Sequence, residues 1–208
     1  MNASTSPIIA IAQSQIEVAA EMMALAFSSD PSVRYLIENE SDRLVTLKHF
    51  WQNVLDHDFR YQRIYTCDGL MGVASWLPPD AAIEPFWNYL PLLSGILRRS
   101  GWRSGWNSTR KLLAIMTATD SFRHKDCPQP HWYLNGLAVS PQAQGQGVGS
   151  QLLRPVLELA DRQGEICYLY TSTEGAVRFY QRQGFVVRSE LQVLKDSPTL
   201  WMMMRSPQ

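Results

Sequence analysis

The sequence has few cysteines, no long apolar run and no excess of charge of either sign. Its three cysteines, Cys67, Cys127 and Cys167, are widely spaced and form no CxxC pair, which argues against a disulfide framework or a zinc site and suits a reducing compartment. Residues 1–7 are polar and lack the basic region and apolar run of a signal peptide. The most apolar stretch, residues 81–97, is interrupted by polar residues and prolines and is too short to span a bilayer. We therefore expect a cytoplasmic protein that has no membrane partner.

The charges of the chain balance, because 19 basic side chains stand against 19 acidic ones in 208 residues. Zero net charge gives no overall field to attract nucleic acid, so we expect no nucleic-acid partner. Hydrophobic residues make up 45% of the chain and aromatic residues 11%, which excludes a disordered protein. The sequence shows no repeats or linkers. We expect residues 1–208 to form a single domain, as a monomer or homodimer, that holds no metal.

Hydrophobic periodicity predicts strands and helices along the whole chain. The first part predicts a strand at 8–11, helices at 16–27 (capped by Ser14), from Pro31, and from Ser41 to Leu55, and two antiparallel strands at 61–67 and 70–77 around Asp68-Gly69. The last part predicts a strand at 131–139, a helix at 148–163 that Pro155 kinks, a strand at 166–170, a helix at 175–182, and strands at 185–194 and 200–204. This order is typical of an α+β or mixed α/β fold.

Residues 79–130 differ from the rest and are predicted to form a helical insertion, broken at Pro91 and at 101–105. No acidic residue occurs between Glu84 and Asp120, while basic and aromatic side chains alternate up to Lys111. The basic aromatic run is either a helix surface with buried Trp rings or a contact for an acceptor or a cofactor phosphate. A nucleic-acid-binding role would require salt-sensitive binding, and the zero net charge argues against it.

The most informative pattern is a run of three alternating glycines, Gly145, Gly147 and Gly149, between a predicted strand and a predicted helix. Such glycines suit a turn at which the backbone itself touches a ligand, because glycine accepts positive φ and has no Cβ. Unpaired N–H groups at a helix N-terminus favour a phosphate or pyrophosphate as that ligand. Ser150, which follows directly, stands where a P-loop has lysine and where the dinucleotide fingerprint has its third glycine, so neither motif fits.

Two segments carry a resemblance to a known family. Gln144-Gly145-Gln146-Gly147-Val148-Gly149 resembles the Q/R-x-x-G-x-G/A acetyl-CoA motif of the GNAT superfamily of N-acetyltransferases, and Phe179-Tyr180-Gln181-Arg182-Gln183-Gly184-Phe185 resembles its F-Y-x-x-x-G-F element. The specific resemblance covers residues 131–187. The segments 131–134 and 200–203 also look like a small bacterial subgroup, most of whose members have unknown acceptors.

The resemblance implies a mostly antiparallel central sheet with a splayed parallel strand pair, flanked by helices. It also implies acetyl-CoA as co-substrate, with its arm between the two splayed strands and its pyrophosphate at the glycine turn. We expect Gly136 to mark a bulge that lets the strands part. The implied cofactor-binding residues are Leu137, Ala138, Val139, Gln144, Gly145, Gln146, Gly147, Val148, Gly149, Ser150, Thr173, Ala176 and Phe179.

The reaction implied by the resemblance is direct acetyl transfer to a primary amine of a small molecule or peptide. Backbone N–H groups near Val139 would stabilise the oxyanion, and Tyr180 would act as the catalytic proton donor to the departing CoA thiolate. Alternatively, Tyr180 is a packing residue. The acid-free, Trp-rich insertion predicts a neutral, aromatic or carboxylate-bearing acceptor, and it argues against polycations such as aminoglycosides.

Three positions depart from the family pattern. Tyr170 stands where subgroup members often have Glu, Ala176 replaces an Asn, and Asn135 puts no carboxylate on the central strand. These losses favour one alternative, a protein that keeps the fold and senses acetyl-CoA without catalysis. Among the histidines, His131 is interpreted as a hydrogen-bonding residue at a strand end rather than a base. The remaining three, His49, His57 and His124, are interpreted as surface or satisfied groups.

Overall fold

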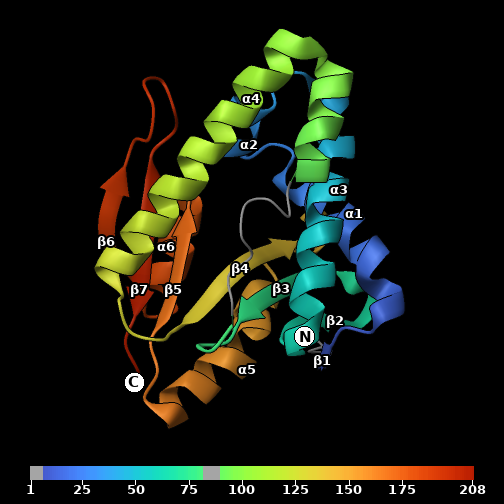
Figure 1. The fold of residues 1–208 in the computed structure, drawn as a ribbon. Helices are drawn as coiled ribbons and strands as arrows, with labels where there is room; N and C mark the ends of the chain where they lie inside the picture. The colour runs from blue at the N-terminus through green and yellow to red at the C-terminus, as the bar shows by residue number, and fades with distance from the viewer. Residues whose placement is uncertain (1–6, 82–89) are drawn as a thin grey trace.

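The computed structural model describes residues 7–81 and 90–208, and within 90–105 it describes the backbone alone. One sheet carries all seven strands of this described part (Figure 1). The strands are β1 Ile8–Ala10, β2 Ile64–Cys67, β3 Gly72–Leu77, β4 Trp132–Val139, β5 Cys167–Thr171, β6 Val186–Leu191 and β7 Leu200–Arg205. The α-helices are α1 Ile16–Phe27, α2 Pro31–Leu36, α3 Glu40–Asp58, α4 Leu90–Asp126, α5 Val148–Gln163 and α6 Glu174–Gln181.

The strands lie in the order β1-β2-β3-β4-β5-β7-β6. Every neighbouring pair is antiparallel except β4 and β5, which are parallel. That parallel pair is joined at only two positions, Trp132 with Cys167 and Tyr133 with Tyr168. Beyond these positions the two strands diverge, so the mostly antiparallel sheet with one splayed parallel pair is confirmed.

Helices cover both faces of the sheet (Figure 1). On one face, α1 and α3 pack on each other and on β3, while α5 packs on the other face against β2, β3 and β4. The long helix α4 contacts α2 and α3 at one side of the molecule and β6 and β7 at the other. It therefore bridges the two halves of the sheet that lie on either side of the splay, the gap where β4 and β5 diverge.

A bulge in β4 decides which residues face which layer. Ser75 of β3 pairs with Gly136, but the next residue, Trp76, pairs with Leu134, so Asn135 is an extra residue in β4. Leu134 lies in the core beneath α5, whereas the ideal Cβ position of Gly136 points at α1 and α3. In a regular strand Leu134 and Gly136, two positions apart, would face the same side, and the bulge places them on opposite sides. The expected bulge therefore exists, but Asn135 rather than Gly136 is the inserted residue.

Gly136 has a different role, which is close packing. A Cβ at this position would lie 2.8 Å from Cε of Met23 on α1 and 2.8 Å from the ring of Trp51 on α3. Both of these side chains are buried. The absence of a side chain thus lets the two helices approach the strand.

The helix starts differ in part from the expectations. Ser14 caps no helix: the chain enters α1 through a 3₁₀ turn, η1 Gln13–Gln15, and the Gln15 side chain accepts from the Ala12 N–H at 2.9 Å. Ser14 lies within this 3₁₀ turn and not directly before α1, so its side chain cannot cap α1. Pro31 is the first residue of α2 as expected, and Asp30 caps it by accepting from the Ser32 and Val33 N–H groups.

The segment expected as a helical insertion contains α4. The expected break at residues 101–105 is wrong, because the helix assignment runs through them without interruption. Figure 1 shows that α4 bends strongly along its length. Pro91 is the second residue of α4, where a missing N–H costs no hydrogen bond. Residues 82–89 of the expected insertion lie outside the described part.

Two further local expectations have simple outcomes. The turn between β2 and β3 is longer than two residues: η3 Asp68–Leu70 fills it, with positive φ at Gly69 and Leu70. Pro155 lies inside α5, which continues from Val148 to Gln163, so the helix is not broken; the expected kink stays a prediction. None of the helices described by the structure is long and apolar enough to cross a membrane.

We predict that Gly136→Ala destabilises the fold, because the Trp51 ring cannot move away as easily as the end of Met23. Overpacking of this kind typically costs about 1–3 kcal/mol. Gly175→Ala is the matched control, since a Cβ there meets nothing within 4 Å and the residue lies in α6. Urea unfolding of both variants measures the effect, and equal free energies of unfolding would contradict the close packing at Gly136.

Candidate active site

The site begins where β4 and β5 stop pairing. After Tyr133, β4 pairs only with β3, and after Tyr168, β5 pairs only with β7. The facing edges of the two strands therefore leave peptide groups that need hydrogen-bond partners. Leu137, Ala138 and Val139 lie on the diverging part of β4. An extended ligand that contains amide groups can pair with such an edge.

The glycine turn follows β4 and opens α5. Gly145 and Gly147 have φ of 75° and 81°, and the N-cap of α5 is Gly147, with no side chain capping it. A Cβ at Gly145 would meet nothing within 4 Å, and one at Gly147 would meet only the end of Gln151 at 3.9 Å. The backbone is thus exposed at the end of a helix whose first-turn N–H groups have no intrahelical acceptor. This arrangement can hold an anion.

The side chains of the turn stabilise the turn itself. Gln144 Nε2 donates to the Val139 carbonyl at 3.2 Å, and Gln146 Nε2 donates to the Gln142 carbonyl at 2.7 Å. Ser150 Oγ accepts from Gln183 Nε2 at 3.0 Å, which ties α5 to the end of α6. The side chains of Gln144, Gln146 and Ser150 are thus engaged within the protein, and ligand contacts of their backbone N–H groups stay a prediction.

Gly149 serves the contact between α5 and α6. A Cβ there would lie 3.2 Å from Cζ of Phe179 and 3.6 Å from Cγ2 of Val139. Thr173 caps α6, with its hydroxyl accepting from the Ala176 N–H at 3.3 Å. Thr173, Ala176 and Tyr180 also line a cavity that lies over the diverging strands. Phe179 instead packs against the core. The structure thus brings the predicted residues of α6 close to the glycine turn and the splay.

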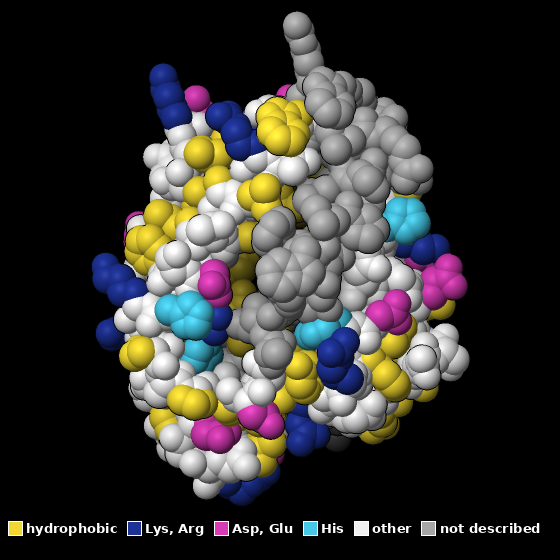
Figure 2. Space-filling model, viewed as in Figure 1, with side chains coloured by type: hydrophobic (Ala, Val, Ile, Leu, Met, Phe, Trp, Pro, Cys, Tyr) yellow, Lys and Arg dark blue, Asp and Glu magenta, His cyan; other side chains and the backbone are white. Residues whose placement is uncertain are grey.

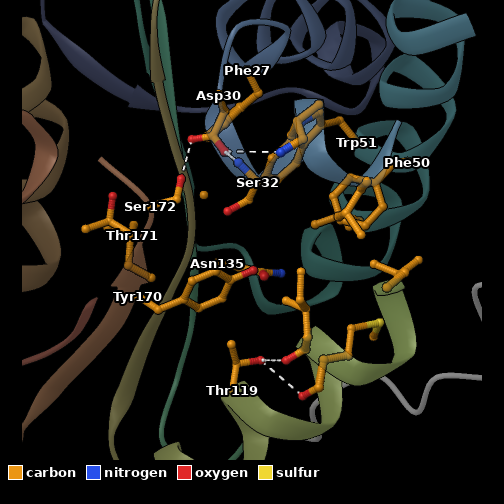
Figure 3. A pocket seen from close by; sticks show the side chains of 18 of the residues that line it. Phe27, Asp30, Ser32, Phe50, Trp51, Thr119, Asn135, Tyr170, Thr171 and Ser172 are labelled. Atoms are coloured by element: carbon orange, nitrogen blue, oxygen red, sulfur yellow. Dashed lines mark hydrogen bonds between the residues drawn. The ribbon is translucent and has the colours of Figure 1, made fainter. Parts of the chain in front are cut away.

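A cavity of about 1030 Å³ lies over the splay. Its walls come from α1, α2, α3, the second half of α4, both diverging strands and α6. Figure 3 shows the aromatic side chains of Phe27, Phe50 and Trp51 on one side and Tyr170 on the other. Figure 2 shows apolar side chains at the bottom of a hollow in this face, and described basic side chains scattered among acidic ones. The cavity is therefore suited to a ligand with an apolar body.

Tyr180 is a buried cavity residue with an unengaged hydroxyl. Its ring packs edge-on against Phe179 and Phe185, with centroids 5.1 and 5.7 Å apart. Among the described residues, none forms a hydrogen bond with the Tyr180 hydroxyl. Burial raises the pKa of Tyr180 well above its usual range. The phenol is therefore protonated at neutral pH and can act as a donor.

Tyr170 extends into the same cavity from β5. The residue is 40% exposed, and it lines the cavity. Burial, with a smaller contribution from the Asp30 carboxylate, raises the pKa of Tyr170 to about 12. Asp30 itself accepts from the Ser172 hydroxyl at 2.6 Å, a bond that holds the start of α2 over the end of β5.

The sequence-based reasoning missed a buried acid, Asp58, at the end of α3. Asp58 and His57 are both buried and line the cavity, and His57 Nδ1 lies 3.0 Å from Asp58 Oδ1. The interpretation of His57 as a satisfied group is confirmed. Asp58 could have been found, because it continues the buried stripe of Leu47, Trp51 and Leu55 at helical spacing.

The other titratable candidates are structural. His131 is buried, with Nδ1 2.7 Å from the Gln129 carbonyl and Nε2 3.4 Å from Arg123, and burial lowers its pKa. Its interpretation as a hydrogen-bonding residue is confirmed. In the basic aromatic run, Lys111 donates to Glu38 at 2.7 Å and to the Tyr35 carbonyl at 3.0 Å. The side chains of residues 90–105 in this run lie outside the described part of the chain. The described residues contain no cluster of His, Cys, Asp or Glu able to hold a metal.

Comparisons with known proteins agree with this geometry. The profile of the Acetyltransferase (GNAT) family matches residues 76–185. An uncharacterized N-acetyltransferase of Schizosaccharomyces pombe is 27% identical over 199 residues, which cover 91% of this chain and 79% of that protein. A Corynebacterium glutamicum structure described as a histone acetyltransferase and related acetyltransferase is 23% identical, with a TM-score of 0.69 over 98% of both chains. Arylalkylamine N-acetyltransferase 2 from Aedes aegypti is 12% identical, with a TM-score of 0.62 over 99% of this chain and 100% of that one.

Proposed function

Because this chain belongs to the GNAT family of acetyltransferases, we propose that it transfers an acetyl group from acetyl-CoA to a primary amine. The observation that carries the proposal is the splay: β4 and β5 part after two paired positions, and the gap leads to the exposed glycine turn. Leu137, Ala138 and Val139 would pair with the amides of the cofactor arm. The N–H groups from Gln144 to Ser150 would hold its pyrophosphate.

Acetyl-CoA would supply an activated acetyl thioester, and the protein would align the acceptor amine with it. N–H groups of β4 near Val139 would donate to the thioester oxygen. As the new C–N bond forms and the C–S bond breaks, Tyr180 would give its phenolic proton to the departing sulfur. The amine nitrogen loses one proton overall, and solvent returns a proton to Tyr180.

The described cavity wall favours an acceptor with one amine on an apolar body. Each of its three carboxylates is already engaged: Asp30 caps α2 and binds Ser172, Asp58 binds His57, and Asp120 binds Arg123 at 2.6 Å. A polycation would need several unengaged carboxylates. The aromatic side chains of Phe27, Phe50 and Trp51 instead fit a flat apolar body (Figure 3).

We predict that acetyl-CoA supports acetylation of 2-phenylethylamine at least about tenfold more efficiently, in kcat/KM, than acetylation of spermidine or kanamycin, a ratio equal to about 1.4 kcal/mol. Release of free CoA thiol measures each rate. Preferred acetylation of spermidine or kanamycin would contradict the acceptor class. Tight binding of acetyl-CoA without turnover of any amine would instead indicate a sensor.

We predict that Gly147→Val severely weakens acetyl-CoA binding, because its side chain would project from the turn into the space proposed for the pyrophosphate. Gly164→Val is the matched control: it has a φ of 71°, lies at the opposite end of α5 and has open space around it. Both variants carry similar backbone strain, so calorimetric titration should show a loss of affinity for Gly147→Val alone. Unchanged affinity in a folded Gly147→Val protein would refute the pyrophosphate site.

We predict that Tyr180→Phe lowers kcat at least about a hundredfold, with little change in KM for acetyl-CoA or in thermal stability, because general acid catalysis is typically worth 10²- to 10⁴-fold. The ring that packs against Phe179 and Phe185 remains in this variant.

Tyr170→Phe is the control for Tyr180→Phe, since it removes another phenol that lines the cavity. Single-turnover kinetics ensure that chemistry is measured. If Tyr180→Phe keeps more than about a third of the rate, Tyr180 is a packing residue. A large loss in Tyr170→Phe alone would move the role to Tyr170.

A further inference from the structure

Asp58 is a fully buried carboxylate that joins α3 to both strands at the bulge. Its Oδ2 accepts from Ser75 Oγ of β3 at 2.6 Å and from Asn135 Nδ2 of β4 at 2.9 Å. Its Oδ1 lies 3.0 Å from His57 Nδ1. Within the described part of the chain, no lysine or arginine forms an ion pair with it. The carboxylate is therefore held by its contacts with His57, Ser75 and Asn135, in a region of low dielectric.

These contacts fix the orientation of the Asn135 amide. A carboxylate only accepts hydrogen bonds, so the NH₂ group of Asn135 must face Asp58, and the side-chain oxygen must face away from it. Asn135 lines the cavity, and Figure 3 shows the Tyr170 ring pointing toward it. No described residue donates a hydrogen bond to Asn135 Oδ1. The bulge thus presents an acceptor oxygen to the cavity at the point where β4 and β5 part.

We propose that Asn135 binds the attacking amine of the acceptor through Oδ1, and that Asp58 positions Asn135 and offsets the positive charge of the amine. This assignment rests on the proposed acetyl transfer. Asn135 touches the substrate, whereas Asp58 acts through it and through its electrostatic field. His57 and Ser75 hold Asp58 in place.

The chemistry of the amine suits this site. A primary amine offers N–H donors, which pair with a carbonyl oxygen, and its nitrogen becomes more positive as it forms the bond to the acetyl carbon. Asn135 Oδ1 accepts one of these N–H groups, and the nearby Asp58 charge stabilises the positive nitrogen. Asn135 lies only two residues before Leu137, where the cofactor arm is proposed to begin pairing. The same strand would therefore align both reactants.

Two variants separate the contact from the charge. Asn135→Ala removes the acceptor oxygen. Asp58→Asn removes the charge, and its amide oxygen can still accept from Ser75 and Asn135. Its NH₂ group donates to His57 Nδ1 once the imidazole takes the tautomer that carries its proton on Nε2. Thr66→Val is the matched control, since it deletes a buried hydroxyl that donates to the Gly72 carbonyl at 2.8 Å in the same sheet, away from the cavity.

The measurements are kcat, KM for the amine, KM for acetyl-CoA and the thermal midpoint. The probe is whichever of 2-phenylethylamine, spermidine and kanamycin the wild-type protein acetylates best. We expect Asn135→Ala to raise KM for the amine about 10- to 100-fold and Asp58→Asn to lower kcat/KM for the amine about tenfold. KM for acetyl-CoA should stay within about threefold in both. Thr66→Val should lower the thermal midpoint without changing either KM.

The outcomes are distinct. If the wild-type protein acetylates the amine but Asn135→Ala keeps its KM for the amine within about threefold, the role of Asn135 is wrong while acetyl transfer stands. An unchanged kcat/KM in Asp58→Asn overturns the electrostatic role. If Asn135→Ala does not fold, Asn135→Ser replaces it, because its hydroxyl can still donate to Asp58 but lacks the carbonyl oxygen. Absence of turnover by the wild-type protein refutes acetyl transfer and this role together.

Discussion

The rest of the structure depends on the short parallel contact between β4 and β5. Two paired positions, Trp132 with Cys167 and Tyr133 with Tyr168, join the halves of the sheet, and beyond them the strands diverge. A sheet that parts in this way exposes peptide groups that need partners, and it creates space for them between the strands. The cavity and the helices that line it lie about this gap, and the glycine turn follows the diverging strand β4.

Polar contacts hold the gap in shape from both sides. Asp30 at the start of α2 binds Ser172 at the end of β5, across 142 positions of sequence. Asp126 at the end of α4 accepts from Tyr168 of β5 and Ser189 of β6, both at 3.1 Å. Each contact ties a helix on one side of the cavity to the far half of the sheet. The opening is thus set by bonds between distant segments, which favours a preformed site.

One of the three carboxylates of the described cavity wall, Asp58, lies at the bulge between β3 and β4. Asp58 is fully buried, and its hydrogen bonds to Ser75 and Asn135 cross the bulge between β3 and β4. A buried carboxylate is costly unless it is well hydrogen-bonded, so its presence here has a clear structural role in holding the bulge. The same contacts turn the oxygen of Asn135 toward the cavity. Asp58 therefore holds the bulge in place and, in the proposed reaction, also positions the residue that binds the amine.

The sequence alone determined the parts that local chemistry controls. The order of strands and helices, the positive φ of Gly145 and Gly147, and the start of α2 at Pro31 follow from residue types and spacing. The motifs around these glycines and Tyr180 also identified the family. Local signals failed where a competing turn intervened, as at Ser14, where a 3₁₀ turn replaced the expected cap.

Only the tertiary structure decided the features that join distant segments. The alternating burial of β4 gives no sign of the extra residue at Asn135, because the bulge appears only in its register with β3. The role of Gly136 depends on Met23 and Trp51 from two different helices. Asp58 reaches Asn135 across 77 positions. No periodicity encodes such a pairing, since it arises from how α3 packs on the sheet, and that packing is a property of the whole chain.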